Sequence, residues 1–139
     1  MNTNLEKAKE MLIYGDYTCV LYDGASEYHS NQRGVRPLID FLNSKTDFSS
    51  YCAADKVVGA GAAHLYVLLK VKTVWAYVLS NAAKVILESN NIKVHFNKQV
   101  PYIINSTGDG MCPIELCVSG ITDSNDALVA IRKRLKELT

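Results

Sequence analysis

The chain has 139 residues, of which 48% are hydrophobic and 21% charged, and its formal net charge is +1. This length and composition predict a single globular domain over residues 1–139 and exclude a disordered chain. A net charge of +1 creates no electrostatic field that would attract nucleic acid or an anionic membrane. No apolar run is long enough to cross a bilayer, and the N-terminus lacks a signal-peptide pattern, so we expect a cytoplasmic protein.

The first part of the chain is predicted to alternate between helix and hairpin. Thr3 and Glu6 have capping-box spacing ahead of a helical apolar stripe, and Asp23-Gly24 is a strong hairpin signal. Pro37 favours the first turn of a second helix. The predicted elements are a helix over residues 4–14, a strand over 18–22, a return edge strand over 26–30 and a helix over 36–42.

The middle and the end of the chain alternate between strands and helices. Asp55 is predicted to be the N-cap of a buried helix that runs to about Lys70. After it the sequence predicts a strand over 73–79, a helix over 81–89, a strand over 93–96, an extended piece over 100–105, a short helix from 112 and a C-terminal helix over 123–136. These elements fit one three-layer α/β domain with a βαβ unit.

The cysteines and histidines show no metal-binding pattern. Four cysteines are scattered without a C-x-x-C pair, and the three histidines lack ligand spacing, so we expect no metal, no disulfide and no cofactor. Of the three histidines, His64 is interpreted as a hydrogen-bonded core residue.

The run that begins at Asp55-Lys56 is the first candidate site. Gly59 and Gly61 each cost about 0.8–1 kcal/mol inside a helix, so either close packing or a ligand near the backbone must compensate. In the ligand interpretation, Asp55 and Lys56 stand at a helix N-terminus, where an anion would meet backbone N–H groups. The order of the glycines matches neither a P-loop nor a dinucleotide fingerprint.

Other candidate residues lie at predicted helix starts. Ser80 and Asn81 follow the best strand, where ligands gather in open α/β sheets, although Ser80 is equally explained as an N-cap. Cys112 at a helix start is a candidate nucleophile or an inert thiol, and Glu115 is a candidate general acid or a capping-box member. Arg36 is a candidate for binding ligand charge or a solvated side chain.

Five segments, in this order, resemble a small prokaryotic family of unassigned function that is grouped with the cytidine deaminase-like fold. They are Gly34–Leu38, Ala54–Ala63, Ser80–Ala83 with Leu87-Glu88, Val100–Asn105 and Cys112–Glu115. The resemblance implies an α/β/α sandwich around a five-stranded mixed sheet. Deaminase zinc ligands lie at two helix N-termini, as H-x-E and P-C-x-x-C. The corresponding places here are 54–56 and 79–83, and they contain no His or Cys.

These observations lead to three functional hypotheses. The first is a deaminase-like domain without zinc that binds a small polar or anionic metabolite at the helices starting at Asp55 and Ser80. The second is a metal-free hydrolase or transferase that uses Cys112 or the Asp55/Lys56 pair. The third is a non-catalytic interaction module, with the strand near 26–30 and the Tyr102 region as candidate surfaces of a homodimer.

Overall fold

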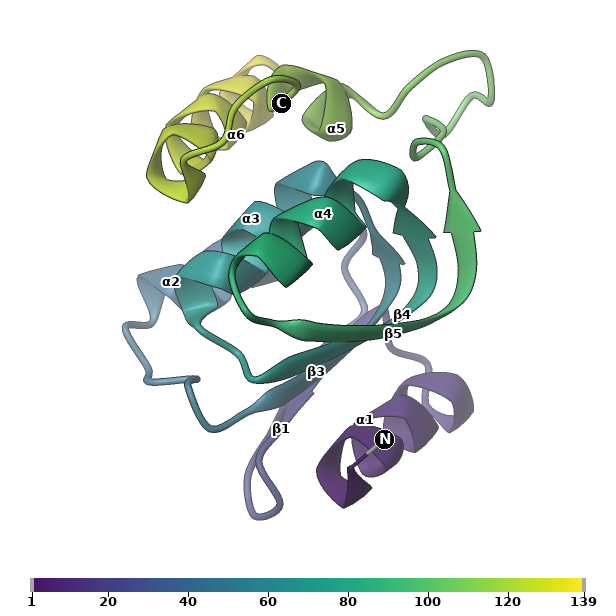
Figure 1. The fold of residues 1–139 in the computed structure, drawn as a ribbon, viewed down its shortest axis with the longest axis vertical. Helices are drawn as coiled ribbons and strands as arrows, with labels where there is room; N and C mark the ends of the chain where they lie inside the picture. Colours follow the sequence, from purple (N-terminus) through teal and green to yellow (C-terminus); the bar gives the residue numbers. More distant parts are fainter. Residues whose placement is uncertain (1, 139) are drawn as a thin grey trace.

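The computed structural model describes residues 2–138 and contains one five-stranded mixed sheet with six helices (Figure 1). The strands are β1 (Cys19–Tyr22), β2 (Glu27–Ser30), β3 (Cys52–Val58), β4 (Thr73–Ser80) and β5 (Lys93–Val100), and their order in the sheet is β2-β1-β3-β4-β5. The strands β1 and β2 are antiparallel to each other, β1 is antiparallel to β3, and β3, β4 and β5 run parallel. The predicted α/β class and mixed sheet are confirmed. The helices are α1 (Thr3–Tyr14), α2 (Arg36–Asn43), α3 (Ala60–Leu69), α4 (Asn81–Ser89), α5 (Pro113–Cys117) and α6 (Ser124–Leu138).

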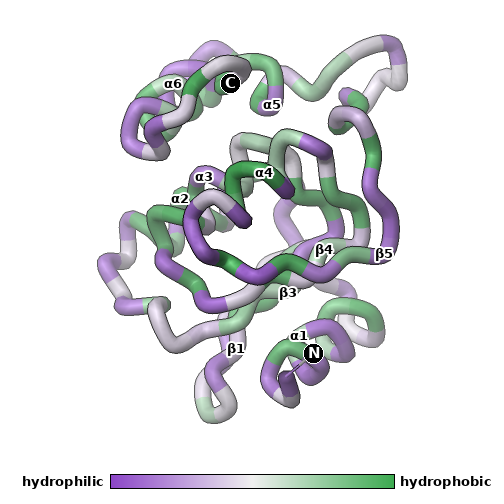
Figure 2. The backbone as a smooth tube through the Cα atoms, viewed as in Figure 1, coloured by the Kyte–Doolittle hydropathy of each residue, from purple (hydrophilic) through white to green (hydrophobic). Residues whose placement is uncertain are grey.

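Helices cover the two faces of the sheet unequally. Helix α1 packs on one face, with Leu5 and Leu12 against Trp75 and the buried side chains around it. Helices α2, α3 and α4 cover the other face, and α5 and α6 lie outside that helix layer (Figure 1). Figure 2 shows hydrophobic segments along α4, whereas the outer part of β5 is hydrophilic, as suits an edge strand.

Most predicted elements are present, with shifted ends. The hairpin turn at Asp23 is confirmed, because its carboxylate accepts the backbone N–H groups of Ala25 and Ser26. The N-cap of α1 is Asn2 rather than Thr3: the Asn2 side chain accepts the Leu5 N–H at 2.7 Å. The strand predicted over 93–96 continues to Val100 because it pairs with β4 along its whole length.

The main error concerns the segment predicted as one helix from Asp55 to Lys70. Residues 52–58 instead form β3, and α3 begins only at Ala60, with Gly59 as its N-cap. β3 is inserted between β1 and β4, so its backbone hydrogen bonds are made with two neighbouring strands. The β-branched residues Val57 and Val58 suit this strand. The helix prediction was therefore wrong for residues 55–59.

His64 joins α3 to the start of α6, as expected of a core histidine. It is 1% exposed, with Nδ1 2.9 Å from the Ser124 hydroxyl and Nε2 3.2 Å from the Ile121 carbonyl oxygen. Burial lowers the pKa of this imidazole. His64 therefore stabilises the packing of α6 on α3 in its neutral form.

Candidate functional site

The strand β3 places Asp55 on the face of the sheet that α2, α3 and α4 cover (Figure 1). Asp55 is 8% exposed and lies opposite Cys19 of β1 in the strand register. Its carboxylate oxygen Oδ2 accepts the hydroxyl hydrogen of Tyr66, from α3, at 2.6 Å. Its Oδ1 accepts the backbone N–H of Val57 at 3.2 Å. Strand pairing and the α3 helix thus fix this carboxyl group from two sides.

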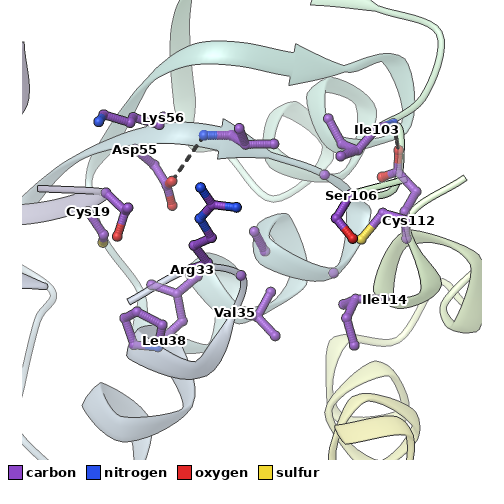
Figure 3. Close-up of a pocket in the computed structure, with 18 of the residues that line it drawn as sticks. Cys19, Arg33, Val35, Leu38, Asp55, Lys56, Ile103, Ser106, Cys112 and Ile114 are labelled. Carbon is purple, nitrogen blue, oxygen red and sulfur yellow. Dashed lines mark hydrogen bonds between the residues drawn. The ribbon is translucent and has the colours of Figure 1, made fainter. Parts of the chain in front are cut away.

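Lys56 does not form a pair with Asp55. Consecutive residues of a strand direct their side chains to opposite faces, so Asp55 points toward α3 and Lys56 points away from it. Lys56 is exposed, and Figure 3 shows its side chain leading away from Asp55. The prediction that these residues stand at a helix N-terminus is wrong, because residues 52–58 form the strand β3.

Burial governs the protonation of Asp55. Loss of hydration raises the pKa of this carboxyl from 3.8 to about 7, although hydrogen bonds from Tyr66, Val57 and Lys56 oppose the rise. The Tyr66 hydroxyl also lies 3.3 Å from the Cys19 sulfur. Burial, with the nearby Asp55 charge, raises the pKa of both Tyr66 and Cys19, so these two groups stay protonated at neutral pH.

A cavity of about 390 Å³ opens beside Asp55. Figure 3 shows Arg33 directing its guanidinium toward Asp55, with Val35, Leu38 and Ile114 along the opposite wall. Ser106 and Cys112 lie together at the far end. Its full lining is Thr18, Cys19, Arg33, Gly34, Val35, Pro37, Leu38, Asp55, Lys56, Val57, Gly59, Gly61, Ala62, Ile103, Ile104, Ser106, Cys112, Ile114 and Glu115. Mostly apolar walls with a few converging polar groups are typical of small-molecule sites.

Glu115 joins four segments at the edge of the cavity. Its Oε2 accepts the backbone N–H of Ala60, at the start of α3, and the Ser80 hydroxyl at 3.0 Å. Its Oε1 accepts the Ile103 N–H at 2.7 Å. The capping-box interpretation placed this carboxylate on its own helix α5 and was therefore wrong, because Glu115 caps α3 instead. The anion at the α3 N-terminus is a side chain of the chain itself.

Close packing explains Gly59 and Gly61. A Cβ added at Gly59 would lie 2.8 Å from a Glu115 carboxylate oxygen, and one at Gly61 would lie 2.5 Å from the Ile114 side chain. These contacts come from α5, so the two glycines permit α5 to approach the start of α3. Gly59 nevertheless lines the cavity, as the ligand interpretation expected.

The other predicted residues divide between two places. Cys112 lies at the cavity and is half-buried, at the N-cap of α5 but with no side-chain capping bond. Ser80 caps α4 through the Ala83 N–H at 3.1 Å, as predicted, and is fully buried behind Glu115. Neither Asn81 nor Arg36 lines the cavity. The Asn81 side-chain oxygen accepts a hydrogen bond from the Gln99 amide, and Arg36 is exposed.

Sequence reasoning missed Cys19, Arg33 and Tyr66. Cys19 is opposite Asp55 only because β1 pairs with β3, and that register cannot be read from either strand. Tyr66 did carry a signal, because a tyrosine in an apolar helix needs a partner for its hydroxyl. Arg33 stands in a polar loop two residues before the Val35 N-cap, with no pattern that separates it from Arg36.

Comparison with known proteins places the chain in a family. A solved structure of a DUF1893 family protein (TM1506) from Thermotoga maritima superposes with a TM-score of 0.85 and 24% identity, covering 99% of this chain and 92% of that one. This likeness shows the fold. No curated protein matches the chain. A family model described as a domain of unknown function (DUF1893) matches residues 7–135, and the chain therefore belongs to the DUF1893 family.

Proposed function

We propose that this domain binds a small polar or anionic metabolite in the cavity beside Asp55. The observation that carries the proposal is a buried carboxyl group, with its pKa raised to about 7, that faces a mostly apolar cavity of about 390 Å³. Pockets of about 300–1,000 Å³ with this character commonly hold small ligands. The site differs in place from the helix ends expected from the sequence, because Glu115 fills the α3 N-terminus.

We also propose that the fold is related to that of the cytidine deaminases and works without zinc. The mixed five-stranded sheet supports the relation, as do two helix starts, at Ala60 and Ser80, that meet at one carboxylate. Since α3 begins at Ala60, the place of the H-x-E motif is Gly59–Gly61. Neither this segment nor Ser80–Ala83 offers an imidazole or thiolate, and residues 2–138 hold no group of three potential metal ligands. These side chains do not fit a zinc centre.

A metal-free enzyme is the second candidate function, and the protonation of Asp55 favours it. A general acid–base works best when its pKa lies near the operating pH, and Asp55 satisfies this while lining the cavity. The group that transfers the proton would be Asp55 alone, since Lys56 points elsewhere. Conversion of a bound metabolite by the wild-type protein, lost in Asp55→Asn, would establish this activity.

No helix within residues 2–138 is long and apolar enough to span a membrane. We propose that the domain acts in the cytoplasm, which is consistent with the absence of disulfides among its four cysteines.

A screen of small metabolites by native mass spectrometry and thermal shift tests the binding proposal. We expect a ligand that raises the melting temperature of the wild-type protein and of Ser119→Trp, but not of Ser106→Trp. Both serines are exposed, but only Ser106 lines the cavity, where an indole would obstruct the ligand. A ligand that binds all three proteins equally would place the site elsewhere, and no ligand for any of them would favour the interaction module.

A further inference from the structure

Arg33 is an exposed cationic residue that lines the cavity, and Lys56 is the other cation among the lining residues. Arg33 lies in the loop before α2, and Figure 3 shows its guanidinium pointing toward Asp55. Within residues 2–138 its side chain makes no hydrogen bond or ion pair, so no ion pair of 4.0 Å or less joins it to Asp55. A planar guanidinium beside apolar walls suits a planar anion, which it can bind through two parallel hydrogen bonds.

Burial favours the neutral form of Asp55, whereas the hydrogen-bond donors and cations beside it favour the ionised form. An anion bound next to Asp55 adds a like charge and so shifts this balance toward the neutral form. The groups near it are Cys19 from β1, Tyr66 from α3 and Arg33 from the loop before α2 (Figure 3), with Lys56 next to it on β3. Cys112 and Glu115 line the same cavity farther from Asp55. Cys19 and Tyr66 stay protonated at neutral pH because burial raises their pKa. Glu115 already accepts three hydrogen bonds. A protonated Asp55 therefore offers an O–H donor opposite the guanidinium of Arg33.

The charge and the walls of the cavity restrict the ligand further. The guanidinium of Arg33 balances one negative charge, and the Lys56 side chain leads away from Asp55 (Figure 3). The Glu115 carboxylate, which also lines the cavity, disfavours a second anionic group. The walls consist largely of aliphatic side chains, among them Val35, Leu38, Ile103 and Ile114. A ligand with a single anionic group and a compact apolar body matches both features.

We infer, on the basis of the proposed function, that the ligand is an aromatic or branched carboxylic acid whose carboxylate binds between the guanidinium of Arg33 and a protonated Asp55. The carboxylate accepts hydrogen bonds from both groups, and the apolar body lies against Leu38 and Ile114. Because the ligand carboxylate and an ionised Asp55 would repel each other as neighbours, the ligand binds the protonated form of Asp55 and binding takes up a proton. Affinity therefore falls as the pH rises through 7.

The test uses two probes that share a ring and differ in charge, benzoate and benzamidine. Each is titrated into the ¹⁵N-labelled protein at pH 6 and at pH 8, and binding is followed by two-dimensional amide NMR spectra. We expect benzoate to shift the amides of Arg33, Asp55 and Ile103. Its dissociation constant should be about tenfold higher at pH 8, since only the protonated fraction binds and the pKa is about 7. Benzamidine should leave these amides unchanged.

Three variants separate the roles of the residues. Asp55→Asn places a neutral N–H donor where the carboxyl hydrogen lies, so it should bind benzoate with the same affinity at both pH values. Arg33→Ala should weaken benzoate at least about tenfold, because it removes a charge-assisted hydrogen-bond pair. Arg36→Ala, a nearby arginine outside the cavity, should bind as the wild type does.

The outcomes are distinct. Benzoate that binds more tightly at pH 8, benzamidine that displaces it, or the absence of benzoate binding at pH 6 would each overturn the carboxylate inference. Equal effects of Arg33→Ala and Arg36→Ala would also overturn it. The cavity proposal would survive all four results if a screened metabolite still bound the wild type and not Ser106→Trp. A screen without ligands would instead contradict the proposed function itself.

Discussion

Glu115→Ala is expected to lower the free energy of unfolding by about 3–5 kcal/mol, because it removes a buried acceptor of three hydrogen bonds. The substitution leaves three donors without their acceptor: the backbone N–H groups of Ala60 and Ile103, and the Ser80 hydroxyl. Each donor left unsatisfied in a buried place costs about 1–3 kcal/mol. Urea denaturation followed by circular dichroism measures the change.

Two further variants show whether the acceptor oxygens cause this loss. Glu115→Gln keeps one oxygen, which can still accept from Ala60 and Ser80, so we expect an intermediate loss of about 1–2 kcal/mol. Glu88→Ala removes an exposed glutamate from α4 and should change stability by less than about 0.5 kcal/mol. If Glu115→Ala were as stable as Glu88→Ala, the carboxylate would not hold α5 and Ile103 to the start of α3.

Asp55→Asn is expected to stabilise the protein at pH 8 and to leave it nearly unchanged at pH 4. The pKa of Asp55 is 3.8 as a model group and about 7 in the folded protein, so the folded state binds more protons between these values. The stability that Asp55 contributes is therefore complete at low pH and is lost as the pH rises through 7. Since each pKa unit corresponds to about 1.4 kcal/mol, we expect the variant to gain about 2–4 kcal/mol at pH 8.

His64 also makes the stability depend on pH, in the opposite direction to Asp55, and subtracting the wild-type value from that of the variant cancels its contribution. Burial lowers the pKa of His64, so its contribution to stability is lost as the pH falls below the ordinary histidine range. Urea denaturation of both proteins at pH 4, 6 and 8 gives the difference that belongs to Asp55. Asp16→Asn, an exposed control, should show no such trend. A difference between wild type and Asp55→Asn that is the same at all three pH values would refute the raised pKa.

Local chemistry predicted the elements whose signals are contained in a few neighbouring residues. The Asp23 turn, the proline-started helix at Arg36 and the Ser80 cap are of this kind, and all three are present. The segment around Asp55 failed because its conformation is decided by pairing with β1 and β4, strands that are distant in the sequence. The helix was predicted from the capping character of Asp55 and the apolar run after it, whereas Val57 and Val58 suit a strand and the pairing with β1 and β4 forms one.

The same cause limited the prediction of the site. Asp55, Cys112 and Glu115 were identified as chemically competent residues, and the structure places all three around one cavity. Their predicted arrangement was wrong. Asp55 lies in the strand β3 rather than at a helix start, and the Glu115 carboxylate accepts hydrogen bonds from other segments rather than capping its own helix. Arg33, which we propose binds the ligand, precedes α2 and lines the cavity, whereas Arg36 begins α2 and does not, and no local sequence pattern separates the two.

NMR titration of the side-chain carboxyl carbon of Asp55 measures whether this group titrates near pH 7 and whether a ligand in the cavity shifts its pKa. The resonance, assigned with the Asp55→Asn variant, is followed from pH 3 to pH 9 with and without benzoate. We expect a midpoint near pH 7 that moves upward when benzoate is present, because the bound carboxylate favours the protonated form of Asp55. A midpoint near the ordinary value of 3.8, unchanged by benzoate, would contradict this expectation.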